Sequence, residues 1–389
     1  MTDPFRRFRV ALKRRESRVI TSFYLEPDDG GDIWPYRPGQ YLTLRIPTTG
    51  GLVLRTYSLS TADTKTRMHR ISVKREDQGI GSGWLHDRVA EGDVIEVAAP
   101  RGGFVLDEDS TRPVLLLAGG VGVTPLLAML HRLATTDRKV WFIQAAEDGD
   151  VHALRDEVAG LAAAAAGRIV ARSVYRSPTD QDRVARRFDA EGFISRELLQ
   201  SLLPLDDYDV YLCGPSPFMV AMWRLLTGLG VAPDRIAYEF FGKGGSLARL
   251  AEEPAASKPA PASVLPVHAP KSLARLEHIT DPDARAVPDV LPAAKGPKPA
   301  TNGAAVDQVV FARSGVTAAW DGSPASILDL AEAAGLDPDF SCREGICNTC
   351  MCSIKEGDVE YVRAPLDPPP PGKVLICCTR PVGRVVLNL

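Results

Sequence analysis

The sequence lacks an excess of charge of either sign and a long unbroken apolar run. Its 389 residues include 46 Lys and Arg against 49 Asp and Glu, which gives a net charge of −3 with His neutral. This balance argues against a dedicated nucleic-acid binder, which needs a basic excess to neutralise phosphates. The longest apolar stretch, residues 114–130, is interrupted by three glycines, Thr124 and Pro125. It is therefore not a membrane span, and we expect no membrane association.

A signal peptide and an even set of cysteines are missing as well. Seven Arg and Lys among the first eighteen residues are not followed by an apolar segment, so no secretory signal is expected. The six histidines form no recognisable ligand spacing. Of the seven cysteines, Cys213 lies mid-chain and the other six fall in the last fifth of the sequence. An odd number crowded into one segment predicts a metal site in a reducing cytoplasm rather than a disulfide framework.

The first part of the chain contains two different secondary-structure patterns, one after the other. Residues 5–110 contain short alternating apolar runs between Gly, Pro and Asp turns, namely 41–46, 69–74 and 93–98. They predict an antiparallel β-barrel or sandwich. Residues 111–244 alternate apolar strands, at 114–118, 140–144, 169–174 and 209–212, with helical stretches at 125–134, 152–161 and 217–229. This alternation predicts an α/β domain with a parallel sheet and helices on both faces. One further helix, at 82–89, is expected in the first domain.

Residues 245–305 are rich in Pro and Ala and have no sustained periodicity, so they are interpreted as a linker, with one helical turn at 271–279. Ordered sequence resumes in a final domain over 306–389. A strand is expected at 309–311. A helix is expected to have Ser323 as its N-cap and to stop at Gly335.

The cysteine spacing in this last domain is specific. Cys342, Cys347 and Cys350 form C-x4-C-x2-C, and Cys377 follows twenty-seven residues after Cys350. This is the plant-type spacing for four thiolates around a two-iron, two-sulfur (2Fe–2S) cluster. Structural zinc sites usually repeat C-x2-C twice, and buried thiols need no spacing at all. Gly345 lets the loop wrap tightly, with backbone N–H groups directed at the sulfur atoms.

Residues 306–389 thus resemble the plant-type ferredoxin domain, an α+β (β-grasp) fold. The resemblance selects Cys377 over Cys378 as the fourth ligand, because only Cys377 gives the C-x3-P ending with Pro381. Cys352 and Cys378 then serve as small apolar residues. Asn348 departs from the family pattern, in which glycine is commoner, but Asn also accepts a positive φ.

A possible flavin site lies in the first domain. Residues 55–60 read Arg-Thr-Tyr-Ser-Leu-Ser and follow a strand that begins near Tyr41. Arg and Ser side chains suit a phosphate, and a Tyr ring suits a planar ring system. Gly79-Ile-Gly-Ser82 follows at the start of an expected helix, whose N-terminal N–H groups favour an anion. By itself the segment could equally be an ordinary strand with an aromatic side chain on one face.

Two glycine-containing turns in the second domain suit a dinucleotide. The first, residues 117–125, follows a buried strand and carries three glycines, with Thr124 expected as helix N-cap and Pro125 at the first helical position. Its glycines would let the backbone approach a pyrophosphate at the helix N-terminus. The alternative is a tight strand–helix turn without a ligand. The second turn is Cys213-Gly-Pro215, in which Cys213 could also be a packed core thiol.

Together with residues 145–152 and 188–192, these motifs resemble the ferredoxin reductase superfamily, in particular the reductase half of flavohaemoglobins, over about residues 8–242. The resemblance implies a flavin site at Tyr41, Arg55, Thr56, Tyr57, Ser58, Gly81 and Ser82. It implies a nicotinamide site at Gly119, Gly120, Gly122, Thr124, Cys213, Gly214 and Pro215, with Glu239 and Phe241 ending the module near the flavin. FAD is expected rather than FMN, although some reductases of this layout bind FMN.

The nucleotide preference follows from charge. Glu147 and Asp148 come after the second strand of the α/β domain, where such reductases meet the adenosine ribose. Carboxylates there would repel a 2′-phosphate and accept a hydrogen bond from a free 2′-OH, so NADH is predicted rather than NADPH.

The three domains imply an electron-transfer reductase. Electrons would pass from NADH to FAD, then to the 2Fe–2S cluster and on to a terminal acceptor such as an oxygenase component, so the cofactors carry the chemistry and no catalytic side chain is expected. Residues 307–389 carry eleven Asp and Glu and seven Lys and Arg, a net charge of −4. They could dock on the basic residues of the N-terminal segment or on a basic partner, and these basic residues could equally be a solvated charged strand edge. The alternatives are an iron–sulfur redox sensor or carrier without a catalytic partner, and a zinc-binding module.

Overall fold

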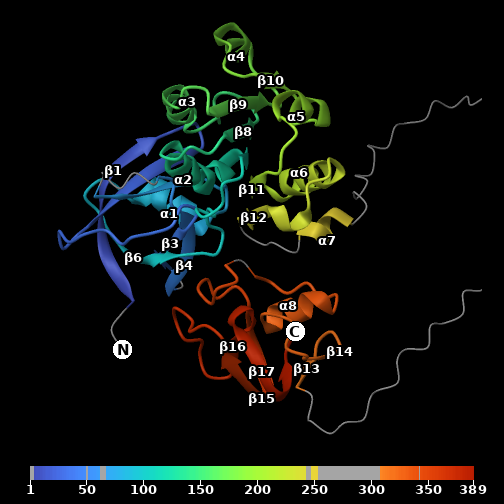
Figure 1. Ribbon diagram of the computed structural model, residues 1–389. Coiled ribbons are helices and arrows are strands. Elements are labelled where there is room, and N and C mark those ends of the chain that lie inside the picture. Colours follow the sequence, from blue (N-terminus) through green and yellow to red (C-terminus); the bar gives the residue numbers. More distant parts are fainter. Residues whose placement is uncertain (1–3, 50, 62–66, 242–246, 253–306, 341) are drawn as a thin grey trace, which may run out of the picture. The chain divides into compact units, whose positions relative to one another are not determined.

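The computed structural model describes residues 4–49, 51–61, 67–241, 247–252, 307–340 and 342–389. Residues Met1–Glu252 and Val306–Leu389 form one compact unit. Within it three separate sheets follow one another along the chain (Figure 1). The expected helical turn at 271–279 lies outside the described residues.

The first sheet is antiparallel and has the order β4-β3-β6-β1-β2-β5. Its strands are β1 (Phe5–Arg15), β2 (Ile20–Pro27), β3 (Tyr41–Thr48), β4 (Gly51–Ser58), β5 (His69–Lys74) and β6 (Val94–Arg101). A bridge between Leu59 and Ile71 joins the end of β4 to β5 and closes the barrel. Phe8, Phe23 and Leu44 fill its core without exposed surface, next to helix α1 (Ile80–Arg88). The predicted antiparallel barrel is confirmed.

The second sheet is parallel and has the order β10-β9-β8-β7-β11-β12. Its strands are β7 (Val114–Gly119), β8 (Val140–Ala146), β9 (Ile169–Tyr175), β10 (Ala190–Glu191), β11 (Asp209–Gly214) and β12 (Ile236–Phe240). Its helices are η1 (Gly120–Gly122), α2 (Val123–Ala134), α3 (Arg155–Ala164), α4 (Asp180–Ala185), α5 (Arg196–Leu202), α6 (Ser216–Gly228), η2 (Pro233–Arg235) and α7 (Leu247–Glu252). The predicted α/β domain is confirmed.

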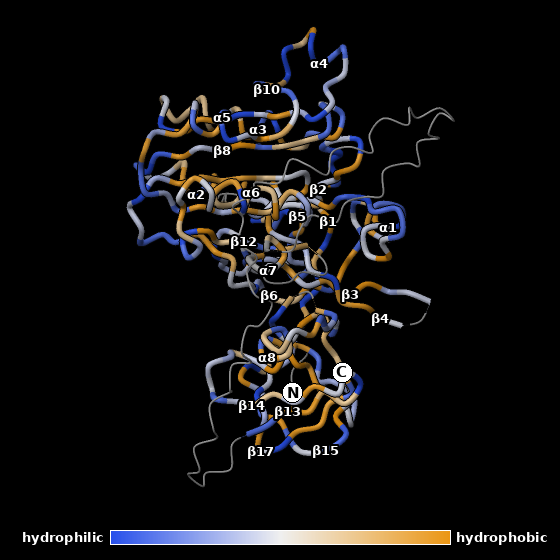
Figure 2. The backbone as a smooth tube through the Cα atoms, turned by 90° about the vertical axis from the view of Figure 1, so that its right-hand side faces the viewer, coloured by the Kyte–Doolittle hydropathy of each residue, from blue (hydrophilic) through white to orange (hydrophobic). Residues whose placement is uncertain are grey.

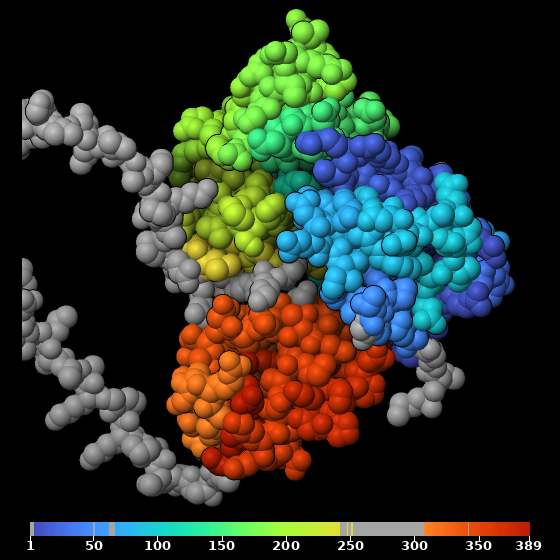
Figure 3. Space-filling model, turned by 180° about the vertical axis from the view of Figure 1, so that it is seen from behind, coloured from blue at the N-terminus to red at the C-terminus, as the bar shows by residue number. Residues whose placement is uncertain are grey.

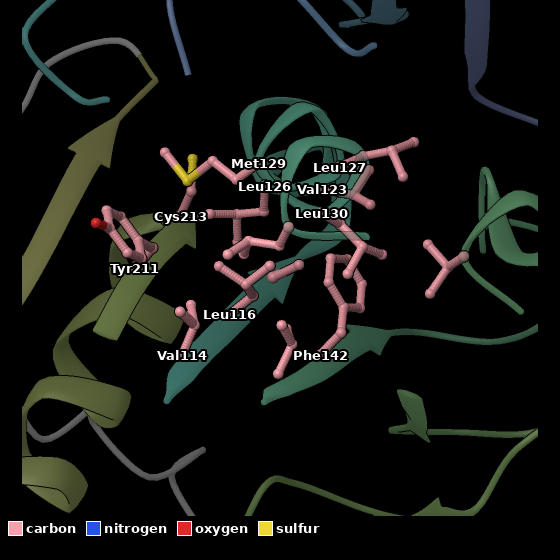
Figure 4. Packing of buried hydrophobic residues seen from close by; sticks show 14 of the residues in the cluster. Val114, Leu116, Val123, Leu126, Leu127, Met129, Leu130, Phe142, Tyr211 and Cys213 are labelled. Carbon is pink, nitrogen blue, oxygen red and sulfur yellow. The ribbon is translucent and has the colours of Figure 1, made fainter. Parts of the chain in front are cut away.

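Two apolar clusters cover the two faces of this parallel sheet. On one face, residues of α2 such as Val123 and Leu130 pack on Leu116 and Phe142 (Figure 4). On the other, α6 places Met219 and Trp223 against the sheet. The chain runs outward from β7 in one direction and from β11 in the other, so the strand order reverses between them. Ligands of open parallel sheets bind outside the carboxyl ends of the strands at such a reversal.

The C-terminal sheet is mixed and has the order β14-β13-β17-β15-β16. Its elements are β13 (Gln308–Phe311), β14 (Val316–Ala319), α8 (Ile327–Ala333), β15 (Met351–Tyr361), β16 (Lys373–Leu375), η3 (Ile376–Cys378) and β17 (Thr379–Leu387). Strand β13 pairs parallel with β17, and the other pairs are antiparallel. Apolar segments, orange in Figure 2, alternate with hydrophilic ones along these strands. The predicted α+β domain is confirmed.

Two expected helix caps are wrong. Helix α2 begins at Val123 after Gly122, and the Thr124 hydroxyl lies inside the helix, where it donates to the carbonyl oxygen of Val121 at 3.1 Å. Helix α8 is capped by Ser326 rather than Ser323. The Ser326 hydroxyl accepts from the backbone N–H of Asp329 and donates to its carboxylate, and this reciprocal pair stabilises the later start.

Two other boundaries differ from the expectation. Helix α3 begins at Arg155 rather than at His152, whose buried ring lies in the preceding loop. Helix α7 falls inside the segment interpreted as a linker, and its Leu247 is fully buried against the cluster beneath α6. None of the described helices has the length and apolar content needed to cross a bilayer. All seven cysteines are free thiols.

Candidate flavin, nucleotide and iron–sulfur site

One cavity of about 1260 Å³ is lined by residues of all three sheet domains. All seven residues predicted at the flavin line it: Tyr41, Arg55, Thr56, Tyr57, Ser58, Gly81 and Ser82. From the nucleotide domain it receives Thr124, Glu239 and Phe241, and from the C-terminal domain Cys342 and Cys377. The other predicted nucleotide residues are not among those that line the cavity and lie at the carboxyl ends of β7 and β11 or in the turns that follow: Gly119, Gly120, Gly122, Cys213, Gly214 and Pro215.

The barrel wall of the cavity depends on a close approach of α1 to β4. A Cβ atom on Gly81 would lie 2.6 Å from the Tyr57 hydroxyl and 2.8 Å from Cγ of Arg55, so only glycine allows this approach. The Ser82 hydroxyl accepts from the backbone N–H of Glu76 at 3.1 Å and holds the turn before the helix. Burial raises the pKa of Tyr57, which therefore stays neutral. A guanidinium, hydroxyls and a helix N-terminus facing one cavity fit a phosphate-bearing flavin.

The carboxyl ends of β7 and β11 lie so close together that the residues between them must be glycine. A Cβ atom on Gly122 would lie 2.1 Å from the carbonyl oxygen of Cys213, and one on Gly119 would lie 2.7 Å from the Phe218 ring. The Cys213 side chain is fully buried, and burial raises the pKa of its thiol well above the usual value. It is therefore a packed, neutral thiol, and its backbone forms the turn. The glycine-lined strand ends fit the pyrophosphate of a dinucleotide.

Glu239 is the most perturbed carboxyl group in the cavity. Burial raises its pKa to about 8, and the nearby Glu344 carboxylate adds to the shift. Its Oε2 atom is buried and has no hydrogen-bond partner among the described residues. At neutral pH the Glu239 side chain is therefore mostly protonated and has a hydrogen bond to donate. Such an unpartnered polar atom in a cavity wall fits a polar ligand such as a carboxamide or ring nitrogen. Phe241, which is 41% exposed, follows it at the same wall.

The four predicted cluster ligands come together in the C-terminal domain. The Cys347 sulfur accepts from the backbone N–H of Cys342 at 3.4 Å, and Cys350 and Cys377 are buried in one apolar cluster. Backbone N–H groups of Glu344, Ile346 and Cys347 point at the Cys342 sulfur at 3.3–3.4 Å, and that of Gly345 points at the Cys377 sulfur at 3.3 Å. N–H groups directed at sulfur stabilise thiolates, so this loop fits a thiolate-bound iron–sulfur cluster.

The loop owes its path to three residues with positive φ. They are Arg343 (φ +53°), Gly345 (+70°) and Asn348 (+59°). A Cβ atom on Gly345 would lie 2.7 Å from the Cys378 sulfur, so this turn requires glycine. Asn348 adopts the left-handed conformation expected from its place in the motif. The Cys378 thiol itself contacts the carbonyl oxygen of Leu375 at 3.5 Å.

Sequence reasoning missed two supporting residues in this loop. Arg343 pairs with Asp329 and Glu332 of α8, at 2.9 and 2.6 Å, and lies over the Phe340 ring at 4.1 Å. Glu344 accepts from Tyr41 of the barrel. Both lie between Cys342 and Cys347, and this position inside the motif was the only available signal.

The two carboxylates used to predict the nucleotide preference already interact with groups of the protein. Glu147 lies 3.5 Å from the Arg176 guanidinium. Asp148 accepts from the backbone N–H groups of Asp150 and Val151 and shapes the turn after β8. Their negative charge is therefore partly neutralised in the structure.

Three family models match the chain in sequence. The oxidoreductase FAD-binding domain matches residues 7–106, the oxidoreductase NAD-binding domain residues 116–224, and the 2Fe–2S iron–sulfur cluster binding domain residues 312–382. A flavohemoprotein of Bacillus thuringiensis is 45% identical over 252 residues, and one of Pseudomonas aeruginosa is 46% identical over 243 residues. The first match covers 62% of this chain and 62% of the relative, and the second 62% and 60%. This chain therefore spans less than two thirds of the length of these relatives.

Comparison with solved structures gives the same family. The flavohem-like FAD/NAD-binding domain of nitric oxide dioxygenase from Vibrio cholerae is 38% identical, with a TM-score of 0.55, and the match covers 61% of this chain and 98% of that domain. Phthalate dioxygenase reductase shares the fold over 100% of both chains, at 24% identity and a TM-score of 0.52. The chain belongs to the ferredoxin reductase superfamily, with a flavohaemoglobin-reductase-like FAD/NAD module followed by a 2Fe–2S ferredoxin domain. It combines oxidoreductase FAD-binding and NAD-binding domains with a 2Fe–2S cluster binding domain in one chain.

Proposed function

We propose that the protein is a cytoplasmic NADH-dependent reductase that passes electrons through FAD and a 2Fe–2S cluster to a terminal acceptor protein such as an oxygenase component. One observation carries the proposal: a single cavity is lined by the predicted flavin residues and by two of the four predicted cluster cysteines. FAD, when bound, exchanges a hydride for single electrons. The fold of phthalate dioxygenase reductase, described as passing electrons from pyridine nucleotides to [2Fe–2S], supports this order.

In this proposal the barrel residues bind and orient the flavin. Arg55, Ser58 and the N–H groups at Gly81 and Ser82 would hold its phosphates, and the Tyr41 and Tyr57 rings would offer apolar surface to its planar ring system. Both phenols stay neutral because burial raises their pKa values. They therefore supply apolar surface and a hydroxyl donor without adding charge.

The nucleotide residues bind NADH at the end of β7 and β11. The turns at Gly119–Gly122 and Cys213–Pro215 hold the pyrophosphate, and protonated Glu239 donates to the nicotinamide end. Phe241 covers the cavity wall until the nucleotide enters. Glu147 and Asp148 favour a free 2′-OH, although Arg176 offsets part of their charge. We expect kcat/KM for NADH to exceed that for NADPH, and an equal or higher value for NADPH would overturn this preference.

The test of the electron path uses two cysteine variants of the full chain. Cys350→Ser removes a proposed ligand, whereas Cys352→Ser changes a neighbouring buried thiol that we propose does not bind iron. We expect Cys350→Ser to lose the iron–sulfur absorbance and NADH-dependent reduction of cytochrome c, while NADH-dependent reduction of ferricyanide persists. Cys352→Ser should keep all three. Purified wild-type protein with flavin bands alone, or with zinc in place of iron, would refute the proposal. Slow NADH oxidation with every acceptor would favour a redox sensor.

A further inference from the structure

The ferredoxin domain contacts the barrel at the edge of the cavity. The Tyr41 hydroxyl donates to Oε2 of Glu344 at 3.0 Å. Around this hydrogen bond an apolar cluster joins Tyr41, Leu54 and Ala98 of the barrel to Ile346 and Leu366 of the ferredoxin domain. Figure 3 shows barrel atoms, in blue, next to ferredoxin atoms, in orange and red.

The contact also contains an ion pair at its rim. The Arg45 guanidinium lies 3.8 Å from the Asp367 carboxylate, and their side chains are 15% and 42% exposed. Basic residues of β1 pair inside their own domain instead, for example Arg6 with Asp29 and Arg9 with Asp28. The contact therefore has an apolar centre, one central hydrogen bond and a charged rim, as specific protein interfaces do.

Tyr41 occupies an unusual position in this contact. It lines the cavity together with the other predicted flavin residues, and only 5% of its surface is exposed. Its partner Glu344 lies two residues after Cys342, which lines the same cavity. On the ferredoxin side, Glu344 Oε1 is held by the Arg363 guanidinium at 2.9 Å. One side chain thus touches the cavity of the flavin and the loop of the cluster.

We propose that Tyr41 is a positioning residue that holds the cluster loop on the flavin barrel through Glu344, with Ile346 and Leu366 as apolar anchors. The inference rests on the proposed electron path, because it assigns the contact through which the cluster receives electrons. A hydrogen bond to a charged acceptor contributes about 1.5–3 kcal/mol. Its loss should lower the ratio of docked to undocked protein by about ten- to a hundredfold.

The first measurement is structural and needs no turnover. Hydrogen exchange of the full chain, followed by mass spectrometry, reports on peptides that contain residues 52–58 and 364–368. Tyr41→Phe and Glu344→Gln should each raise exchange in both peptides. The control variants are Tyr208→Phe, whose hydroxyl donates to Pro204 within the nucleotide domain, and Glu356→Gln, which pairs with Arg384 within the ferredoxin domain. Neither control should change these peptides, and unchanged exchange in Tyr41→Phe and Glu344→Gln would overturn the proposal.

The second measurement is a stopped-flow mixing with NADH that follows flavin and cluster absorbance in the same sample. In Tyr41→Phe and in Glu344→Gln the ratio of the cluster rate to the flavin rate should fall about tenfold or more. The variant that combines the two substitutions should lower this ratio no further than the more affected single variant, because each substitution removes the same hydrogen bond. Additive losses would overturn the assigned pair. If wild-type cluster is not reduced at all, the proposed electron path fails, while the exchange experiment still decides the contact.

Discussion

The barrel meets its two neighbouring domains in different ways. Toward the nucleotide domain it uses what we call the reductase joint, made by Arg70, His131, Glu157, Phe104 and Tyr211. Arg70, with 4% of its side chain exposed, donates to both carboxylate oxygens of Glu157 at 2.7 and 2.9 Å. His131 lies 2.5 Å from the same carboxylate, and Phe104 meets the Tyr211 ring edge-on at 6.0 Å.

Toward the ferredoxin domain the barrel uses what we call the ferredoxin contact, made by Tyr41, Glu344, Ile346, Leu366 and the rim pair Arg45–Asp367. It is centred on one hydrogen bond and a five-residue apolar cluster. In the reductase joint, by contrast, barrel side chains enter the main apolar cluster of the nucleotide sheet. The flavin and nucleotide domains therefore share one apolar core, whereas the ferredoxin contact has a separate, smaller apolar cluster among the described residues.

The largest expected effect comes from breaking the reductase joint. Arg70→Ala leaves the Glu157 carboxylate without its bidentate partner, so it should lower the free energy of unfolding by about 3 kcal/mol. Arg380→Ala, in an exposed pair with Glu360, is the matched control and should cost less than about 1 kcal/mol. Urea unfolding followed by tryptophan fluorescence measures both. Equal losses would show that the joint is no stronger than a surface ion pair.

The apolar part of the ferredoxin contact gives the next largest effect. Leu366→Ala removes a buried side chain that is 6% exposed, and such truncations cost about 2 kcal/mol or more where they occur. The loss should appear as increased exchange of residues 52–58 across the contact. The unfolding transition of the flavin and nucleotide domains should stay within about 0.5 kcal/mol of wild type. A matching loss in that transition would mean that the two interfaces are not independent.

Lowering the pH should destabilise the reductase joint by a smaller amount. Burial alone would raise the pKa of Glu157, but hydrogen bonds from His131 and Arg70 lower it to about 2, below the usual 4.5. A lowered carboxyl pKa adds stability that is present above about pH 4.5 and is lost as the pH falls toward 2. Thermal unfolding of wild type should therefore weaken across this range. Glu157→Gln should be less stable than wild type at pH 6 and lose less stability on acidification, and parallel curves would contradict this role.

Salt should have the smallest effect, and it should act on the ferredoxin contact alone. Raising the ionic strength from about 0.1 to 1 M shortens the Debye length from about 10 to about 3 Å. The partly exposed Arg45–Asp367 pair should weaken, so that docking measured by hydrogen exchange falls about two- to fivefold. Asp367→Asn should remove this salt dependence. Salt sensitivity that persists in Asp367→Asn would assign the effect to other charges.

Local patterns predicted the elements of the fold well where the period was clear. The alternating run at 69–74 predicted β5, whose bounds are His69–Lys74, and the apolar run at 114–118 predicted β7. The start of α8 was harder to predict, because Ser323 and Ser326 both stand near it. Ser323 before a proline looked like a cap, but Ser326 has Asp329 three residues later, and this pair forms the reciprocal hydrogen bonds.

The residues of the candidate site and of the domain contacts fall into two groups. Their spacing identified Cys342, Cys347, Cys350 and Cys377, because three closely spaced cysteines and one distant cysteine are typical of the ligands of a plant-type 2Fe–2S cluster. Tyr41 and Glu344 are 303 residues apart, and Arg70 and Glu157 are 87 apart. Such pairs carry no local periodicity or motif. Only the tertiary fold brings them together, so their interaction could not be predicted from the sequence.

The N–H groups that surround the cysteine sulfurs have a consequence for how this protein can evolve. The donors at Glu344, Gly345 and Ile346 belong to the main chain. A substitution at Glu344 or Ile346 other than proline keeps them, while it changes the side chain that meets the barrel. Hydrogen bonds to sulfur set the reduction potential of iron–sulfur centres. The driving force for electron transfer thus depends on backbone N–H groups of these residues, whereas the strength of docking depends on their side chains. Selection can therefore change docking while it preserves the driving force.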